Sequence, residues 1–137
     1  MGGILVQVVV FKIGDEEFAV ETSKVQGING LMKITKVPKA EKYIKGLINL
    51  RGSILSVLDI NLLLGMNVSD ENNNNIIVLE LDGEQVGITV DHVEEVMNVE
   101  EDMIKRVHED KNKPFIKGLI NLENRILTMI DIDKLLQ

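Results

Sequence analysis

The side chains best able to do chemistry in this chain are two histidines and a few aspartates, since it contains no cysteine. His92 and His108 lack a second imidazole or a thiolate at metal-ligand spacing, so the sequence predicts no metal site. Asp91 directly precedes His92, and neighbours on a strand point to opposite faces. We therefore interpret both histidines as ordinary surface residues.

Asp59 and Asp131 are better explained as helix caps than as catalytic acids. Each is followed by Ile-x-x-Leu-Leu, the pattern of a short N-capped helix, and Gly65 is placed to end the first one. The chain also lacks a nucleophile elbow, a phosphate-binding loop and a Rossmann glycine pattern. We expect no enzymatic activity, no catalytic residue and no cofactor.

An internal repeat organises the chain. Residues 43–64 recur as residues 115–136 without a gap at an offset of 72, and residues 13–20 recur as residues 81–88 at an offset of 68. A position that both copies keep is needed to fold each copy, whereas a position that differs is free to serve function. We predict two subdomains, 1–68 and 69–137, joined by an asparagine-rich linker.

Arg51 is the sharpest difference between the copies. The first copy has Arg51-Gly52 where the second has Glu123-Asn124, so the charge reverses at this turn. Gly52 and Asn124 both tolerate positive φ, and we expect the two copies to make the same tight hairpin turn. Because the second copy builds its turn with Glu123, the fold does not require an arginine. A binding partner is the better reason for Arg51.

Short aliphatic runs bounded by Gly, Asn and Asp predict strands along the whole chain. These runs are 6–13, 17–20, 47–50, 54–58, 76–81, 86–90, 119–122 and 126–130. About five short strands per copy are most simply closed as two small barrels, which leave no exposed sheet edge. The predicted fold class is all-β with short helices, as two five-stranded barrel-like subdomains related by duplication.

The first strand, at about residues 4–13, is apolar on both faces, which is typical of a strand covered on each side. It can lie between the two subdomains, so the fold can cross the sequence boundary near residue 68. The same run is far shorter than the ~20 residues of a membrane helix and has no basic flank. We expect no membrane insertion.

Charge is unevenly distributed along the chain. The net charge is −7, and residues 1–68 contribute eight basic and six acidic side chains against seven and sixteen in residues 69–137. Lysines recur every third residue in the first copy, at Lys33, Lys36, Lys39, Lys42 and Lys45. With only four aromatic residues and a net negative charge, nucleic-acid binding is disfavoured. The absence of cysteine fits a cytoplasmic protein.

Four aliphatic residues follow the second predicted strand of each copy, at Val25, Ile28, Val93 and Val96. They could line an exposed groove between the subdomains. The spacing of three residues equally suits a buried short helix, and periodicity alone leaves both readings open.

Several motifs resemble the CheW family of chemotaxis coupling proteins. They are residues 14–20 (GDEEFAV), 24–26 (KVQ), 37–38 (VP), 46–52 (GLINLRG) and 57–59 (VLD). The Asn-Leu-Arg-Gly segment with its flanks is specific, and the resemblance covers nearly the whole chain. It implies two five-stranded β subdomains and no enzymatic activity.

The resemblance also implies partners and site residues. The protein would be a cytoplasmic adaptor, recruited to membrane receptor arrays, that couples methyl-accepting chemotaxis receptors to the regulatory domain of the histidine kinase CheA. It would be a monomer when free and a ring or array member in the complex. The residues implied in receptor or kinase binding are Val25, Gly27, Ile28, Gly46, Arg51, Ile76, Val93 and Val96.

Two alternatives stay open at this point. The chain could be an isolated CheW-like regulatory module of a larger signalling protein, such as the CheA regulatory domain or a coupling protein fused to a receiver domain. It could also be a small barrel that binds a ligand or nucleic acid, although no sequence motif supports that reading.

Overall fold

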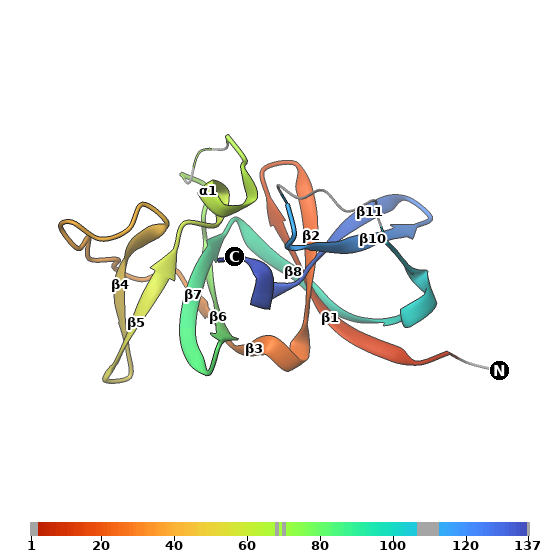
Figure 1. Ribbon diagram of the computed structural model, residues 1–137, viewed down its shortest axis with the longest axis horizontal. Coiled ribbons are helices and arrows are strands. Elements are labelled where there is room, and N and C mark those ends of the chain that lie inside the picture. Colours follow the sequence, from red (N-terminus) through yellow and green to blue (C-terminus); the bar gives the residue numbers. More distant parts are fainter. Residues whose placement is uncertain (1–2, 68, 70, 107–112, 137) are drawn as a thin grey trace.

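The computed structural model describes residues 3–67, 69, 71–106 and 113–136. Its strands are β1 (Leu5–Ile13), β2 (Glu16–Glu21), β3 (Val25–Gly30), β4 (Ile44–Leu50), β5 (Ser53–Leu58), β6 (Asn75–Leu81), β7 (Glu84–Val90), β8 (His92–Glu100), β9 (Ile104–Lys105), β10 (Ile116–Leu122) and β11 (Arg125–Ile130). One six-stranded sheet has the order β8-β1-β2-β11-β10-β9, and one five-stranded sheet has the order β3-β6-β7-β5-β4. The two sheets lie side by side (Figure 1).

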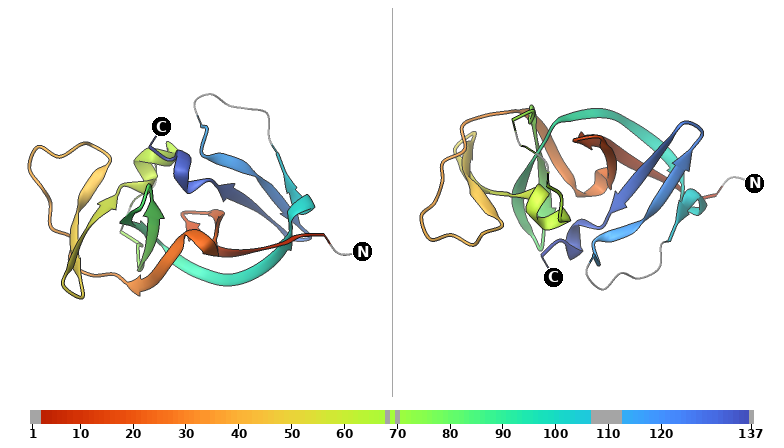
Figure 2. Two further views of the ribbon diagram at one scale, coloured as in Figure 1. Left: turned by 60° about the horizontal axis from the view of Figure 1, so that its bottom comes forward. Right: turned by 90° about the horizontal axis from the view of Figure 1, so that it is seen from above.

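Each sheet combines strands from both copies of the repeat. β1 and β2 of the first copy pair with β8 and β11 of the second, while β6 and β7 of the second copy pair with β3 and β5 of the first. The two copies have thus exchanged their first hairpins, and the red β1 runs among the cyan and blue strands in Figure 2. The expected boundary near residue 68 therefore does not separate the two sheets.

The predicted all-β class with two subdomains is confirmed, with one correction: the sheets are open. β8 and β9 are the ends of one sheet and β3 and β4 are the ends of the other, and no ladder joins those ends within the described ranges. β9 is only two residues long and pairs with Leu119 and Ile120 alone. A strand this short cannot carry the pairing around to close a barrel.

The first strand is buried on both faces. Val8 and Val10 belong to the core of the six-stranded sheet. Val9, Phe11 and Ile13 belong to a larger cluster, here called the shared core, to which both sheets contribute. β6 alternates in the same way between the shared core and the core of the five-stranded sheet. β1 therefore lies between the core of its own sheet and the shared core.

The helices are short, as the sequence predicted: α1 (Ile60–Leu64) and the 3-10 turns η1 (Thr22–Lys24), η2 (Glu101–Met103) and η3 (Ile132–Lys134). Both expected caps are confirmed. Asp59 Oδ1 accepts a hydrogen bond from the Leu62 N–H at 3.2 Å, and Asp131 Oδ1 accepts one from the Asp133 N–H at 3.1 Å. Gly65 ends α1 in the left-handed conformation, at φ 71°.

Candidate functional site

Val25 and Ile28 lie on one face of β3 because this strand contains a β-bulge. The register with β6 shifts between Val25 and Gly27, so that Val25 faces Leu79 and Ile28 faces Ile77. A bulge adds one residue to a strand, and side chains three positions apart then share a face. Both partners on β6 belong to the shared core. The face that carries Val25 and Ile28 therefore continues from that core.

β8 repeats this arrangement in the other sheet. Its register with β1 shifts opposite Val10 and Phe11, so that Val93 faces Phe11 and Val96 faces Val9. Val9 and Phe11 also belong to the shared core. The short-helix reading of the three-residue spacing is therefore wrong, since two bulged strands produce it.

These four residues, Val25, Ile28, Val93 and Val96, form what we call the β3–β8 strip. Val25 and Val93 are partly buried against the shared core. Ile28 is 42% exposed and Val96 is 52% exposed. Three cavities of the described chain are lined by other residues, the first of them, about 310 Å³, lying between α1 and β2. The strip is an apolar band that reaches the surface, without a described cavity of its own.

The two hairpin turns of the repeat differ in backbone conformation. Arg51 and Gly52 connect β4 to β5 with positive φ angles of 53° and 89°, and the Gly52 N–H donates to Asn49 Oδ1 at 2.9 Å. Positive φ at both central residues is typical of a type I′ turn. Glu123 and Asn124 connect β10 to β11 without positive φ. The prediction of one common turn geometry is therefore wrong, although both loops are two residues long.

The Arg51 side chain is exposed, and its backbone conformation is unfavourable for an L-residue other than Asn, Asp or Gly. Among the described residues, no hydrogen bond or ion pair engages its guanidinium. The fold thus holds a strained arginine whose guanidinium has no hydrogen-bond or ion-pair partner among the described residues.

The family model described as CheW-like domain matches residues 7–137. The chain belongs to the CheW-like domain family. Among its relatives, the chemotaxis protein CheW of Klebsiella aerogenes is 34% identical, over 93% of this chain and 79% of the relative. The chemotaxis protein CheW of Bacillus subtilis is 32% identical, over 95% of this chain and 86% of the relative.

A solved structure supports the same assignment. The scaffolding protein TtCheW from Thermoanaerobacter tengcongensis superposes with a TM-score of 0.87 at 26% sequence identity, over 98% of this chain and 89% of that one. CheW-like proteins are non-catalytic scaffolding proteins of chemotaxis. The chain is accordingly not an enzyme.

Ile76 and Gly46, two of the residues implied in partner binding, are not on the surface. Ile76 is fully buried in the core of the five-stranded sheet. Gly46 is also buried, and a Cβ there would lie 2.5 Å from the Thr35 carbonyl oxygen. Its counterpart Gly118 would meet the Lys105 carbonyl oxygen at 2.7 Å. Both copies keep this glycine because a crossing segment passes too close for a side chain.

Gly27, by contrast, sits half-buried at the bulge of β3. A Cβ there would have Asn29 Nδ2 as its nearest neighbour, at 3.7 Å, which is an ordinary contact. Space therefore does not require a glycine at this position, which lies beside the strip.

Arg125 is a residue whose importance the sequence reasoning missed. Its Nε donates to Glu17 at 2.9 Å, its Nη1 to Glu95 at 2.7 Å and its Nη2 to Glu94 at 3.4 Å. It thereby connects β11 to β2 and to the bulge of β8. A comparison of the two copies could have indicated this network, because the counterparts of Arg125 and Glu94 in the first copy are the uncharged Ser53 and Gln26.

The two carboxyl groups in this network influence each other. Burial raises the pKa of Glu94 above its ordinary value, and its hydrogen bond with Glu17 and the charge of Glu17 add to the rise. Burial also acts to raise the pKa of Glu17, but hydrogen bonds from Glu94 and Arg125 outweigh it, so the pKa of Glu17 is lowered. The pair can therefore share one proton across β2 and β8.

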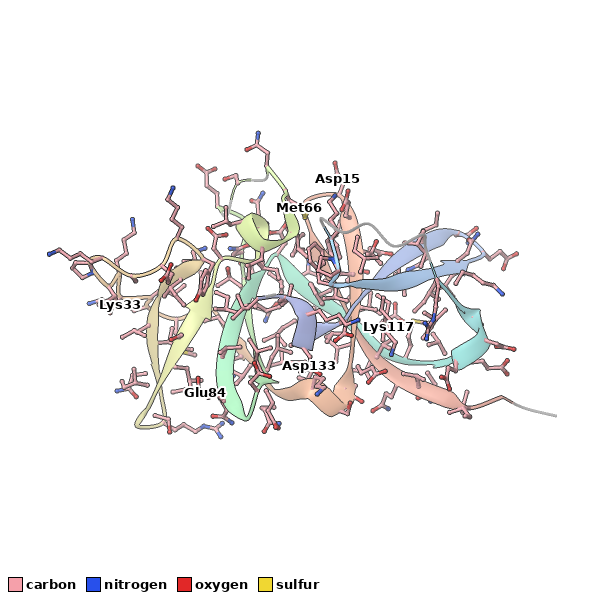
Figure 3. All side chains as sticks on the ribbon, viewed as in Figure 1. Asp15, Lys33, Met66, Glu84, Lys117 and Asp133 are labelled. Carbon is pink, nitrogen blue, oxygen red and sulfur yellow. The ribbon has the colours of Figure 1, made fainter. Side chains whose placement is uncertain are left out.

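Several other charged groups are exposed or partly exposed. Lys33, labelled in Figure 3, belongs to the exposed loop between β3 and β4, at the outer end of the five-stranded sheet. Lys117 pairs with Glu21 at 3.1 Å, and Asp133 pairs with Lys24 at 3.0 Å. These last two pairs are exposed and contribute little to stability.

Two further sequence predictions concern metals and membranes. Within the described ranges, no three His, Cys, Asp or Glu side chains gather in a way that could hold a metal ion. His108 lies outside the described residues. In the part of the chain that the structure describes, no helix is both long enough and apolar enough to span a membrane.

Proposed function

We propose that this chain is a cytoplasmic chemotaxis adaptor that couples the tips of methyl-accepting receptors to the regulatory domain of the histidine kinase CheA. Membership of a scaffolding family supports a role exerted through contacts. The chain offers two features suited to contacts, the β3–β8 strip and Arg51. We assign the strip to the receptor and specificity to Arg51.

The strip is suited to a reversible contact. Full burial of an aliphatic side chain stabilises an interface by ~1.5–3 kcal/mol, and Ile28 and Val96 have about half of their surface left to bury. Each can therefore add roughly 1 kcal/mol before the cost of association is subtracted. Such a contact is strong enough to matter when a kinase contact holds the same protein in an array.

The observation that carries the proposal is the exposed, strained Arg51, which the second copy replaces with Glu123. Arginine is enriched at binding hot spots, where its loss costs ~2 kcal/mol or more. Lys33 lies in the loop that leads into β4, the edge strand of the hairpin that holds Arg51. We expect the partner surface that meets Arg51 to be acidic.

The test is a pull-down with purified CheA and a receptor cytoplasmic fragment, followed by a kinase activation assay. Arg51→Glu copies the residue of the second repeat, and its stability should stay within ~0.5 kcal/mol of wild type while receptor-dependent activation falls. Arg51→Asn creates the Asn-Gly pair that type I′ turns prefer, so stability should rise by about 0.5–1 kcal/mol while activation again falls.

Arg51→Asn makes the test decisive because it separates the fold from the contact. A variant that is more stable and less active shows that the side chain serves a partner. Unchanged activation in both variants would overturn the role of Arg51. Failure of the wild-type protein to bind either partner would overturn the proposed function as a whole.

A further inference from the structure

β3 and β8 carry the two halves of the strip, yet they belong to different sheets. Each is an end strand of its own sheet, and no backbone pairing between them is described. The backbone of Asn74 links the ends of the two strands, since the Leu31 N–H donates to its carbonyl oxygen at 2.9 Å and its own N–H donates to the Asp91 carbonyl oxygen at 3.1 Å. At the strip residues themselves, a side chain adds a second link.

Asn75, at the start of β6, bridges the two strands. Its Nδ2 donates to the carbonyl oxygen of Asn29 on β3, at 3.3 Å, and its Oδ1 accepts from the N–H of Val93 on β8, also at 3.3 Å. The backbone of Asn75 is fixed by its pairing with Gly30 and with Val90. A single half-buried carboxamide thus joins both halves of the strip to a central strand.

The two bonds require opposite chemistry from one short side chain. A carboxamide presents an N–H donor and an oxygen acceptor on one planar group. An aspartate would keep the bond to Val93 but turn an oxygen towards the Asn29 carbonyl oxygen, which repels it. A leucine would lose both bonds.

The repeat does not keep this bridge. The counterpart of Asn75 at the offset of 68 is Gln7, on β1. Gln7 Oε1 accepts a hydrogen bond from Thr22 Oγ1, on η1, at 3.1 Å. The other sheet is therefore built with a different contact at the same place.

We propose that Asn75 is a positioning residue for receptor binding, which holds Ile28 and Val93 at the spacing that the receptor tip recognises. This inference rests on the proposed function. Asn29 directly follows Ile28 in β3, and Val93 is itself part of the strip. Loss of the bridge loosens β3 and β8 where they carry the strip, and a receptor must then spend binding free energy on ordering them.

The experiment compares Asn75→Asp with Asn74→Asp, the same change at the exposed neighbouring residue. The titrations use a receptor cytoplasmic fragment and, separately, the CheA regulatory domain. Asn75→Asp should weaken receptor binding about tenfold and leave kinase binding within about twofold. In Asn75→Leu, which removes the acceptor of the Val93 N–H, amide hydrogen exchange at Val93 should become faster. Asn74→Asp should match the wild type in every measurement.

Three outcomes would overturn the positioning role. The first is unchanged receptor affinity despite faster exchange at Val93. The second is an equal loss of receptor and kinase affinity with a lower melting temperature, which would show a merely structural residue. The third is unchanged exchange at Val93 in Asn75→Leu, which would show that the bridge does not hold β8. Failure of wild-type protein to bind the receptor fragment is a separate result, because it removes the proposed function.

Discussion

Replacing Gly46 with alanine should destabilise the protein strongly, although alanine is ordinarily better than glycine in a strand by about 0.5–1 kcal/mol. The new Cβ would lie 2.5 Å from the Thr35 carbonyl oxygen and 2.6 Å from Ile34 Cγ2. Carbon contacts are optimal at roughly 3.5–4 Å, so the segment must move outward by about 1 Å. Such overpacking costs about 1–3 kcal/mol.

The same movement strains a backbone bridge. The Thr35 N–H donates to the Leu47 carbonyl oxygen at 2.9 Å, and the Leu47 N–H donates to the Thr35 carbonyl oxygen at 2.8 Å. Each such bond contributes about 1 kcal/mol. We therefore expect Gly46→Ala to lower the free energy of unfolding by about 2–4 kcal/mol, a large part of the ~5–15 kcal/mol that stabilises a typical domain.

Urea denaturation followed by circular dichroism measures this loss. Gly118→Ala repeats the experiment in the second copy and should cost a similar amount, since its Cβ would lie 2.7 Å from the Lys105 carbonyl oxygen. Gly30→Ala is the matched control, because no atom lies within 4 Å of its added Cβ. If Gly46→Ala unfolds within ~0.5 kcal/mol of wild type, the packing argument fails and a partner becomes the better explanation of this glycine.

Two further predictions concern charge and capping. Glu94→Gln should stabilise the protein by about 0.5–1 kcal/mol at pH 7 and leave it near wild type below pH 4.5, the ordinary pKa of a glutamate. The sign follows from the raised pKa of Glu94: its contribution to folding stability is present below the ordinary pKa and is lost as pH rises through the raised pKa. Urea denaturation of both proteins across this pH range measures the effect. A stability difference between Glu94→Gln and wild type that does not grow with pH would refute it. Asp59→Ala should lower stability by about 1 kcal/mol by removing the cap of α1, while Asp59→Asn keeps an acceptor and should cost less; equal thermal melts of all three proteins would contradict the capping role.

The sequence predicted eight strands and missed β3, β8 and the two-residue β9. In β4 and β10, which also contain a register shift, the predicted runs begin after it. Eight aliphatic runs correspond to β1, β2, β4, β5, β6, β7, β10 and β11. β3 and β8 were not predicted because a bulge breaks the two-residue alternation that identifies a strand. Val25 and Ile28, three positions apart, then imitate the period of a helix. The sequence therefore named the residues of the strip, but the distortion that creates their shared face left the groove and helix readings open.

The exchange of hairpins could not be predicted from the repeat. A duplication shows which residues have equivalent roles, but β2 has the same apolar pattern whether it pairs with β5 of its own copy or with β11 of the other. The choice depends on the connections and on the shared core, which are long-range properties. Open sheets were missed for a related reason, since strand number alone does not show that β9 is only two residues long.

The repeat also explains why we assign partner binding to Arg51 rather than to other surface residues. Retention alone is ambiguous: Gly46 and Gly118 are retained for packing, whereas Ile54 and Ile126 are retained although they are 61% and 57% exposed. Difference alone is ambiguous as well, because Arg125 differs from its counterpart and serves an internal ion-pair network.

Arg51 combines a difference between the copies with a cost that nothing inside the described chain offsets. A left-handed conformation costs an L-residue roughly 1–2 kcal/mol. Among the described residues, the Arg51 side chain forms no ion pair or hydrogen bond that would offset this cost. Strain that persists without internal compensation is characteristic of residues selected for contact with another molecule. The turn of the second copy, without positive φ, shows that the fold has an alternative of the same length.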